Sequence, residues 1–476
     1  MDEQLKQQTK KGVMWSAIQR FSTQGLQFLI TLVMANFLTP SDYGIVGMLG
    51  VFIALSSVFV DSGFTSALTR KQNPTQEDTS TVFFFNIVIA CIAYIILFFA
   101  APWIADFYDM PAITSVLRVL SLVIIINSFS AVQATLMTKR LDFKTQARIT
   151  VIAISTSGAV GITLAFLGFT YWALVIQGIV SSLLSTFLYW FHSKWRPLLL
   201  FSKKSFCEMF SFGSKLLASS IIDTIYGNIY TVVIGKVFSA GTLGNYSRAE
   251  SYANFPSISI TGIMQRVTYP VLCKMQDDDQ QLANAYRKFL KLSAFVVFPM
   301  MTGLSALAYP FVVATIGRQW EFCSTLLQII CFALMWYPIH AINLNLLQVE
   351  GRTDLSLRIE IIKKIIGVVI LCIFIPLGIV ALCYSRILSS ILCLIVNTYY
   401  TGKLIHVGFI RQMLDLTPTL LISLATWGVV LFSTHFISNI YLQLAIGIAI
   451  GAITYTAISY LFNRELFHSV LTLIRR

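Results

Sequence analysis

Charged residues are scarce in this chain of 476 residues, at 12% of the composition, while 56% of the residues are hydrophobic. A soluble globular protein carries about twice that share of charge. The mean hydropathy of +0.76 shows the same deficit of polar surface. The scarcity of charge therefore excludes a soluble enzyme or binding domain and indicates a protein embedded in lipid.

Signatures of catalysis and of metal binding are also missing. The chain has no Gly-x-x-x-x-Gly-Lys phosphate loop, no His-Glu-x-x-His and no Gly-x-Ser-x-Gly. Its eight cysteines are scattered, and no two of them form a Cys-x-x-Cys pair. We therefore expect no enzyme activity, no catalytic residue, no ATP hydrolysis and no metal site. The only cofactor we expect is a coupling ion, H⁺ or Na⁺.

Basic residues are nearly absent from one set of alternate loops. Each spanning helix needs roughly 20 apolar residues, and the apolar segments predict about fourteen such helices. The loops on one side hold only Arg318, whereas the termini and the other loops hold most of the 34 Lys and Arg residues. This distribution follows the positive-inside rule and predicts a multi-pass protein with both termini in the cytoplasm. The basic charge thus reflects topology, and we expect a lipid bilayer rather than nucleic acid as partner.

An internal repeat recurs at a fixed spacing along the chain. The turn Leu38–Gly44 (Leu-Thr-Pro-Ser-Asp-Tyr-Gly) returns in register as Phe238–Gly244 (Phe-Ser-Ala-Gly-Thr-Leu-Gly). Each copy joins two long apolar segments, and duplicated helix bundles are typical of secondary transporters. We expect an all-α integral membrane fold with two pseudo-symmetric six-helix lobes, residues 1–200 and 201–405. Two further helices and a cytoplasmic tail would follow in residues 406–476.

Polar stripes mark the helices that open the two halves. A charge at bilayer depth costs roughly 2.5–3.5 kcal/mol on insertion scales, so a stripe that carries one avoids lipid. On the next helix, the guanidinium of Arg248 is suited to bidentate phosphate binding. We expect a water-filled cavity that takes an anionic substrate; a dry polar seam, or a structural pairing of Arg248 with a carboxylate, is the alternative. The candidate substrate-binding residues are Arg20, Gln24, Gln27, Lys215, Tyr226 and Arg248.

Acidic residues at bilayer depth are fewer than basic ones. A carboxylate in a cavity can exchange protons or hold Na⁺, so Asp223, Glu250 and Asp61 are candidates for ion coupling. An ordinary salt bridge of Asp223 or Glu250 with Lys215 or Arg248 is the alternative for these two acids. The excess of basic over acidic side chains favours an anionic cargo.

Two features are interpreted as contacts with the membrane surface. Arg386 lies near a helix end, where a long basic side chain can reach the lipid headgroups. From Asp277 to Lys291 apolar residues recur at helical spacing, with acids at the start and bases at the end. This pattern predicts an amphipathic helix that lies in the interface and tethers the protein to the inner leaflet.

Several short segments carry a family resemblance. They are Leu38–Gly44, Trp172–Val175, Leu243–Glu250 and Arg266–Pro270, the last followed by Lys274–Asp277. These segments resemble the polysaccharide-transporter family of bacterial lipid-linked oligosaccharide flippases, nearest to the exporters of colanic and teichuronic acids. The similarity covers at least residues 10–290 and continues more faintly to the end.

The resemblance implies the multidrug/oligosaccharidyl-lipid/polysaccharide (MOP) exporter fold, which MATE transporters share, with fourteen helices in two lobes. It implies a substrate of undecaprenyl pyrophosphate carrying a glycan repeat, flipped from the cytoplasmic to the outer leaflet of a bacterial plasma (inner) membrane. It also implies that Arg20 and Arg248 are the cavity arginines that bind the pyrophosphate, and that an ion gradient drives the cycle. A polysaccharide polymerase and other assembly proteins are the protein partners it suggests.

Two other functions stay open as alternatives. A small-molecule or drug:cation antiporter of the same superfamily would favour a cavity dominated by acids. A membrane enzyme such as a glycan polymerase or ligase needs substantial external loops, which this chain hardly has.

Overall fold

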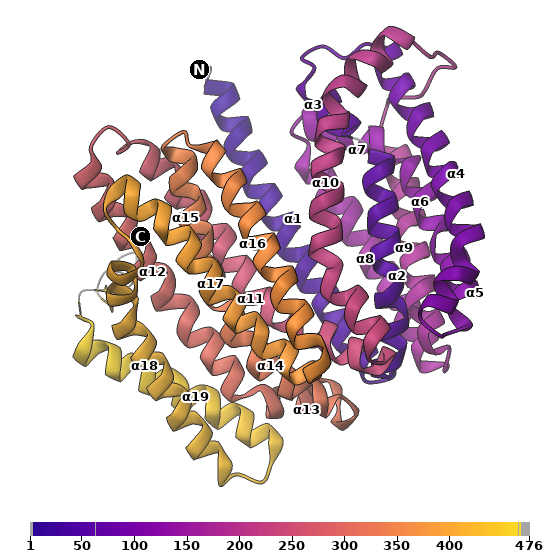
Figure 1. Cartoon of the computed structure of the whole chain (residues 1–476). Coiled ribbons are helices and arrows are strands. Elements are labelled where there is room, and N and C mark those ends of the chain that lie inside the picture. The colour runs from indigo at the N-terminus through magenta and orange to yellow at the C-terminus, as the bar shows by residue number, and fades with distance from the viewer. Residues whose placement is uncertain (1–2, 62, 465, 468–476) are drawn as a thin grey trace. The chain divides into compact units, whose positions relative to one another are not determined.

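A computed structural model describes residues 3–61, 63–464 and 466–467, and in this part of the chain all regular elements are helices joined by connections, without a strand (Figure 1). The all-α fold expected from the sequence is thereby confirmed. The chain divides into two units, Met1–Gly244 and Asn245–Arg476. This boundary follows from contacts, whereas the lobes expected at 1–200 and 201–405 follow from the sequence repeat. The division into two six-helix lobes therefore remains a prediction.

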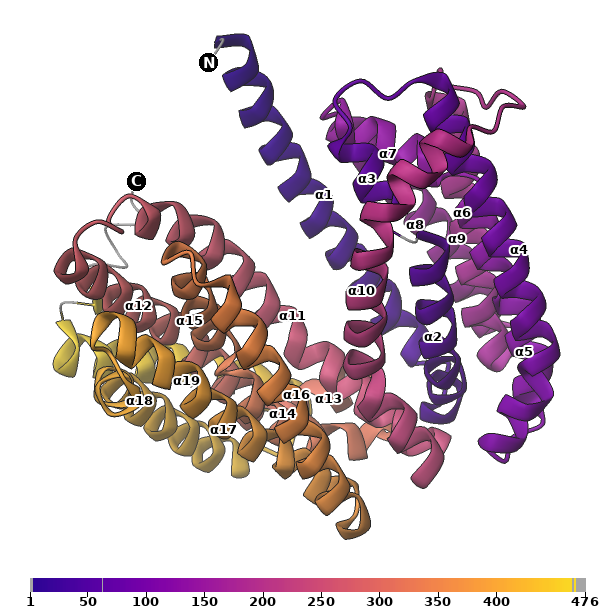
Figure 2. The same ribbon diagram turned by 45° about the horizontal axis from the view of Figure 1, so that its top comes forward.

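The first unit is built from long helices that pack side by side. α2 contacts both α4 and α10, and α8 contacts both α1 and α9. Two views show α10 running alongside α2 (Figures 1 and 2). The helices of this unit are α1 (Glu3–Ala35), α2 (Pro40–Asp61), α3 (Phe64–Arg70), α4 (Gln76–Phe107), α5 (Ala112–Leu120), α6 (Leu122–Ser128), α7 (Ala131–Lys139), α8 (Phe143–Phe166), α9 (Thr170–His192), α10 (Lys203–Val237) and the first turn of α11 (Ala240–Cys273).

The second unit contains the rest of α11 and the remaining helices. α12 packs on α18, α18 on α19, and α17 on both α14 and α16. The 3₁₀ turn η2 separates α16 from α17 and is followed by Gly378, whose φ of 93° favours glycine. The elements are α12 (Asp279–Ala306), α13 (Ala308–Ile316), η1 (Arg318–Trp320), α14 (Glu321–Leu334), α15 (Tyr337–Val349), α16 (Thr353–Phe374), η2 (Ile375–Leu377), α17 (Ile379–Ile405), α18 (Phe409–His435) and α19 (Ile440–Phe462).

The two copies of the repeated turn touch each other within the first unit. A Cβ on Gly44 would overlap the backbone carbonyl of Ala240, and a Cβ on Gly244 would overlap the backbone carbonyl of Pro40. Each contact joins the glycine of one copy of the turn to the equivalent earlier residue of the other copy, so the two contacts are reciprocal. This arrangement is what a local two-fold relation between the turns produces. Glycine at both positions is required because the backbones approach too closely for any side chain.

The start of α4 is linked to the second turn of α10 in the first unit. Thr75 and Asp78 form a capping box, in which each side chain accepts a hydrogen bond from the other residue's backbone N–H. The Lys71 ammonium lies 3.0 Å from the Asp78 carboxylate and 3.1 Å from that of Glu208, on α10. The hydrogen bond with Asp78 raises the pKa of Lys71 above its usual value. One lysine therefore links the beginnings of two helices that are far apart in sequence.

Length and composition identify the helices that can cross a membrane. Among the described residues ten helices qualify, or up to eleven if α5–α6 and α7, bent by 43°, form one span. α1, α11 and α16 are 33, 34 and 22 residues long but are not among the ten. The multi-pass membrane character is thereby confirmed, and the total of about fourteen spans remains a prediction.

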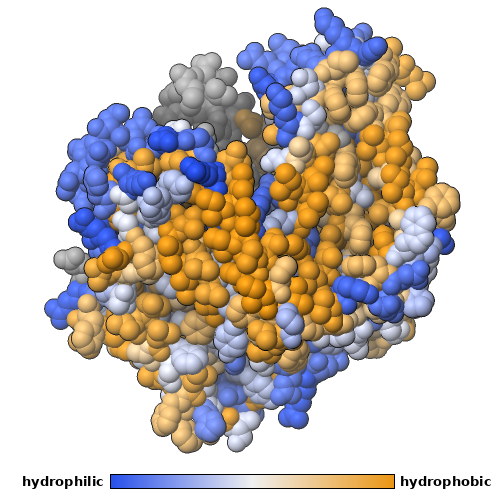
Figure 3. Space-filling view, in the orientation of Figure 1, coloured by the Kyte–Doolittle hydropathy of each residue, from blue (hydrophilic) through white to orange (hydrophobic). Residues whose placement is uncertain are grey.

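Large apolar side chains cover the outward faces of several helices. On α4 the exposed set includes Ile92, Ile96 and Phe99, and on α16 it includes Ile361 and Ile365. Figure 3 shows a hydrophobic band over α16 with hydrophilic residues at its end, and a similar surface over α4. Exposed apolar surface of this extent indicates contact with lipid tails.

The structure corrects the expectation that Asp277–Lys291 tethers the protein to the membrane surface. The segment Asp277–Lys291 is helical as predicted, but from Asp279 onward it is the first part of α12, which continues to Ala306. The apolar residues Leu282, Tyr286 and Leu290 are fully buried inside the second unit. The amphipathic pattern therefore reflects a helix packed on protein, chiefly on α18, and not a helix lying on the bilayer.

Candidate functional site

The predicted polar stripe of the first helix lies on one continuous α-helix. α1 extends unbroken through Arg20, Gln24 and Gln27, so their spacing places them on one face. Arg20 and Gln27 are exposed and Gln24 is half-buried. The cationic face of α1 is thus not packed into the interior of the first unit.

The second polar stripe lies on α10 in the same unit. Lys215 and Asp223 are exposed, and Tyr226 is half-buried. In the most apolar stretch of 18 residues of α10 only 6% of the residues are buried, although the helix packs on α2. The first unit therefore presents two long helices whose polar faces remain accessible, as a helix lining a water-filled cavity requires.

Arg248 and Glu250 belong to the second unit and lie more than two helical turns after the start of α11. Both side chains are half-buried. The predicted cavity draws on residues of both units, Arg20 and Lys215 in the first and Arg248 in the second. The common cavity and the assignment of the six substrate-binding residues remain predictions.

The structure does not place Arg386 at the lipid headgroups, where the sequence analysis expected it. Its guanidinium, on α17, donates hydrogen bonds to the carboxylate of Glu250 and to the hydroxyl of Tyr246, both on α11. The Arg386 side chain is 18% exposed and that of Glu250 is 29% exposed. The interpretation of Arg386 as a side chain that reaches the headgroups is therefore wrong, because it is bound inside a helix pair. The sequence shows both charges but gives no sign that their helices meet.

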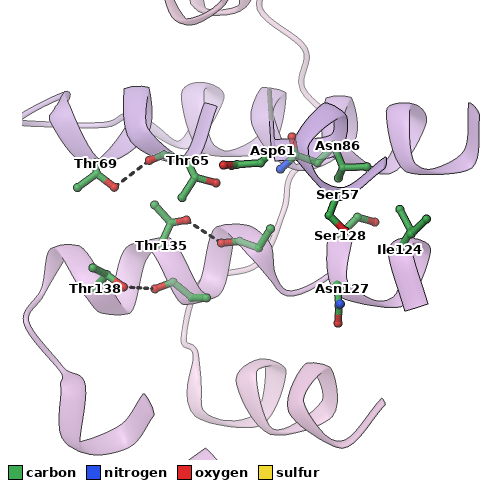
Figure 4. Close-up of a pocket in the computed structure, with 13 residues that line it drawn as sticks. Ser57, Asp61, Thr65, Thr69, Asn86, Ile124, Asn127, Ser128, Thr135 and Thr138 are labelled. Atoms are coloured by element: carbon green, nitrogen blue, oxygen red, sulfur yellow. Dashed lines mark hydrogen bonds between the residues drawn. The ribbon is translucent and has the colours of Figure 1, made fainter. Parts of the chain in front are cut away.

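Asp61 lies at a cavity of about 400 Å³ within the first unit (Figure 4). The walls come from the end of α2, from α3, from α4 and from the broken pair α6–α7. Asn86 of α4 lines the same cavity and is 1% exposed. The sequence analysis missed Asn86; the available signal was a single amide within the apolar run from Val82 to Ala90.

A second charged cluster also escaped the sequence analysis. Asp415 of α18 is 8% exposed and accepts two hydrogen bonds from the guanidinium of Arg287, at 2.6 and 2.7 Å. The Lys291 ammonium lies 3.0 Å from the same carboxylate. This cluster joins α12 to α18 and is a structural element of the second unit. Across the described residues, no three His, Cys, Asp or Glu side chains are grouped to hold a metal ion.

Comparison with known proteins gives a family match. The sequence profile of the family described as polysaccharide biosynthesis protein matches residues 33–325, more than half of the chain. The chain is 23% identical over 455 residues to the teichuronic acid biosynthesis protein TuaB of Bacillus subtilis (strain 168), covering 94% of both chains. It is 25% identical over 471 residues to the succinoglycan biosynthesis transport protein ExoT of Rhizobium meliloti (strain 1021), covering 98% of this chain and 95% of the relative.

A third relative and two solved structures agree with this match. The lipopolysaccharide biosynthesis protein WzxC of Escherichia coli (strain K12) is 26% identical over 365 residues, which cover 75% of this chain and 73% of the relative. The lipid II flippase MurJ, in an inward closed conformation, superposes with a TM-score of 0.74 at 18% identity, covering 95% of this chain and 99% of MurJ. An inward-facing multidrug resistance MATE family transporter of the MOP superfamily superposes with a TM-score of 0.61 at 15% identity, covering 82% of this chain and 98% of the transporter. At these identities the two structures show the fold alone.

Proposed function

We propose, on the premise that the chain belongs to the polysaccharide biosynthesis protein family, that it flips a lipid-linked oligosaccharide across a membrane. The substrate would be an undecaprenyl-pyrophosphate-linked repeat unit, moved from the cytoplasmic to the outer leaflet for surface polysaccharide synthesis. Relatives named for teichuronic acid, succinoglycan and lipopolysaccharide biosynthesis support this substrate class. The MurJ-like fold supports transport of a polyprenyl-linked glycan over catalysis, so the protein would not be an enzyme.

One observation carries the proposal. The polar faces of α1 and α10 stay accessible in a protein that is otherwise covered by apolar side chains, and they hold Arg20 and Lys215. Lipid tails cannot solvate these charges, whereas a pyrophosphate in an aqueous cavity can pair with them. The acids on the same faces are fewer, which disfavours the alternative of a cationic drug antiporter.

The mechanism follows from this placement of charge. The pyrophosphate would bind near Arg20, Lys215 and Arg248, and the polar sugars would occupy the aqueous cavity. The polyprenyl tail would stay in lipid, because its transfer into water is unfavourable in proportion to its apolar area. Closing the cytoplasmic side and opening the other would then expose the glycan outside. The polar residues expected beside these cations are Gln24, Gln27 and Tyr226.

An ion gradient would supply the energy for this cycle. The chain lacks a phosphate-binding loop, so the free energy has to come from another source. Asp223, Glu250 and Asp61 are the acids we propose for coupling to H⁺ or Na⁺.

We place the protein in the plasma (inner) membrane of a bacterium, with both termini in the cytoplasm and about fourteen spans in two lobes. Its protein partners would be a polysaccharide polymerase and other assembly proteins.

Complementation tests the function directly. The gene is expressed in a bacterial strain that lacks its own oligosaccharide flippase and therefore accumulates the lipid-linked repeat on the cytoplasmic side. We expect surface polysaccharide to return and the accumulated intermediate to fall. Unchanged accumulation in several such strains, with the protein present in the membrane at normal level, would contradict the proposal.

A further inference from the structure

The cavity at Asp61 has a wall of oxygen atoms that accept hydrogen bonds. Six hydroxyl groups from α2, α3, α6 and α7 line it, and five of them donate a hydrogen bond to a carbonyl of their own helix, three or four residues earlier. A hydroxyl whose hydrogen is already engaged in a hydrogen bond can only accept a contact from the cavity, through its oxygen lone pairs. The five hydroxyls with these bonds are Ser57, Thr69, Ser128, Thr135 and Thr138.

Asn86 adds a buried polar group that lacks protein partners. Its side chain is 1% exposed, and neither its amide oxygen nor its amide nitrogen has a hydrogen-bond partner among the described residues. Figure 4 shows the polar ends of Asp61 and Asn86 next to one another on one wall, facing Ser128 and Thr135 on the other. Buried amides are rarely left unbonded, so this one points to a ligand in the cavity.

Two interrupted helices also direct their negative ends at the cavity. α2 ends at Asp61, and α6 ends at Ser128 before the chain bends into α7. The carboxyl end of a helix carries a partial negative charge. In transporters, the ends of discontinuous helices and their free carbonyls are used to coordinate cations.

Three basic residues at this end of the unit contact groups other than Asp61. Arg70 lies over the ring of Phe212, and Lys71 pairs with Asp78 and Glu208. Lys139 donates to the backbone carbonyls of Leu68 and Lys71. None of these contacts involves the carboxylate of Asp61.

We propose that this cavity binds one Na⁺ ion, with the carboxylate of Asp61, the amide oxygen of Asn86 and the lining hydroxyls as ligands. A single carboxylate among neutral oxygens matches a single positive charge, whereas Ca²⁺ sites usually bring together more than one carboxylate. Asp61 is exposed and Asn86 is buried, so the ion enters past the carboxylate and ends at the amide. Because its ligands come from both sides of two helix breaks, the ion holds α3 and α7 in one arrangement.

The role of the site, though not its existence, rests on the proposed transport function. If the protein is a flippase, Na⁺ at Asp61 is the coupling ion and its binding biases one conformation of the first unit. This assignment places coupling at Asp61 and not at Asp223 or Glu250.

Binding of ²²Na⁺ to the purified full-length protein in detergent tests the site without any substrate. We expect one saturable site per chain, insensitive to choline. Asp61→Asn and Asn86→Leu should each weaken Na⁺ binding by about tenfold or more, as loss of a ligand or of its support does at metal sites. Asn86→Leu keeps the number and branching of the side-chain heavy atoms, so it should fold and lose only the stabilisation that NaCl gives over choline chloride. Thr135→Ala should weaken binding less.

Two control variants match these changes outside the cavity. Glu77→Gln removes an exposed carboxylate from the first turn of α4, and Thr163→Ala removes a hydroxyl of α8 that donates to its own helix in the same way. Both should bind Na⁺ as the unchanged protein does. The proposal is overturned if the unchanged protein binds no Na⁺, if it only takes up a proton, or if Asp223→Asn abolishes binding while Asp61→Asn does not. Failure of export with normal, Asp61-dependent Na⁺ binding would reject the flippase function and leave the site intact.

Discussion

Arg386 and Glu250 form an ion pair that joins α17 to α11 inside the second unit, and the same guanidinium binds the hydroxyl of Tyr246. Both charged side chains are mostly shielded from solvent. Removing one partner of such a pair leaves the other charge uncompensated, which costs more than losing the pair as a whole.

The first prediction concerns the stability that this pair controls. Arg386→Met should destabilise the second unit by about 3 kcal/mol, the lower end expected for a buried pair that loses one partner. The double variant Arg386→Met with Glu250→Gln should recover a large part of that loss, because no unpaired charge is left. A double-mutant cycle on thermal unfolding in detergent measures the coupling. A double variant no more stable than Arg386→Met alone would show that the pair is not coupled.

The second prediction concerns the reciprocal contact of the repeated turns. Gly44→Ala and Gly244→Ala should each destabilise the protein by about 1–3 kcal/mol, because the added methyl meets backbone atoms that cannot rotate away. Gly50→Ala and Gly241→Ala are the matched controls, since a methyl there has no close neighbour to displace. Unfolding midpoints of the four variants, measured side by side, check the prediction. Equal midpoints for all four would mean that the turns are not in contact.

The third prediction concerns the cluster between α12 and α18. Asp415→Asn should lower stability by about 3 kcal/mol, because Arg287 and Lys291 would then share no carboxylate. Asp354→Asn removes the acid of the exposed pair with Arg352 and should change stability little. The unfolding temperatures of the two variants in the same detergent provide the comparison. A similar loss in both would contradict the structural role given to Asp415.

The fourth prediction concerns pyrophosphate binding. Arg248→Ala should abolish export, because a charge-assisted bidentate contact of about 1.5–3 kcal/mol is lost. Arg248→Lys keeps the charge but not the planar fork, so it should retain partial export. Export is measured in the flippase-deficient strain, with the amount of protein in the membrane measured by immunoblot. Arg140→Ala, in the exposed connection between α7 and α8, is the control and should export normally. Normal export by Arg248→Ala would remove this arginine from the site.

The fifth prediction separates the candidate coupling acids. If Asp61 holds the coupling ion, Asp61→Asn should make export independent of the Na⁺ gradient, while Asp223→Asn should leave the dependence in place. Both variants are assayed for glycan export at several external Na⁺ concentrations with constant ionic strength. A gradient dependence lost in Asp223→Asn and kept in Asp61→Asn would move the coupling site to α10.

Local sequence features predicted local structure well. The apolar segments became helices, and the repeated turn lies between helices as the repeat indicated, with Gly44 and Gly244 near the starts of α2 and α11. Pro376 and Gly378, two residues that commonly end helices, account in the same local way for the short break between α16 and α17. These features depend on neighbouring residues only, which a single sequence contains.

Contacts between distant helices were not predicted. A helix that lies on lipid and a helix that packs on protein both show the apolar spacing of Leu282, Tyr286 and Leu290. The structure shows that α12 packs on protein, because these side chains are buried and Arg287 of α12 pairs with Asp415 of α18. Likewise Arg386 and Asn86 are visible in the sequence as polar residues in apolar runs, but their neighbours come from helices far away along the chain. A single sequence does not contain the pairing of helices, so it gave candidates for the site without their partners.

The packing of α10 on α2 has a consequence for biogenesis. Ribosomes deliver α2 to the membrane long before α10, which begins only at Lys203. Until then the face of α2 that α10 covers has to be shielded by lipid or by the insertion machinery. A nascent chain released at the end of the first repeat would carry that bare face, and quality-control proteases would have a structural reason to remove it.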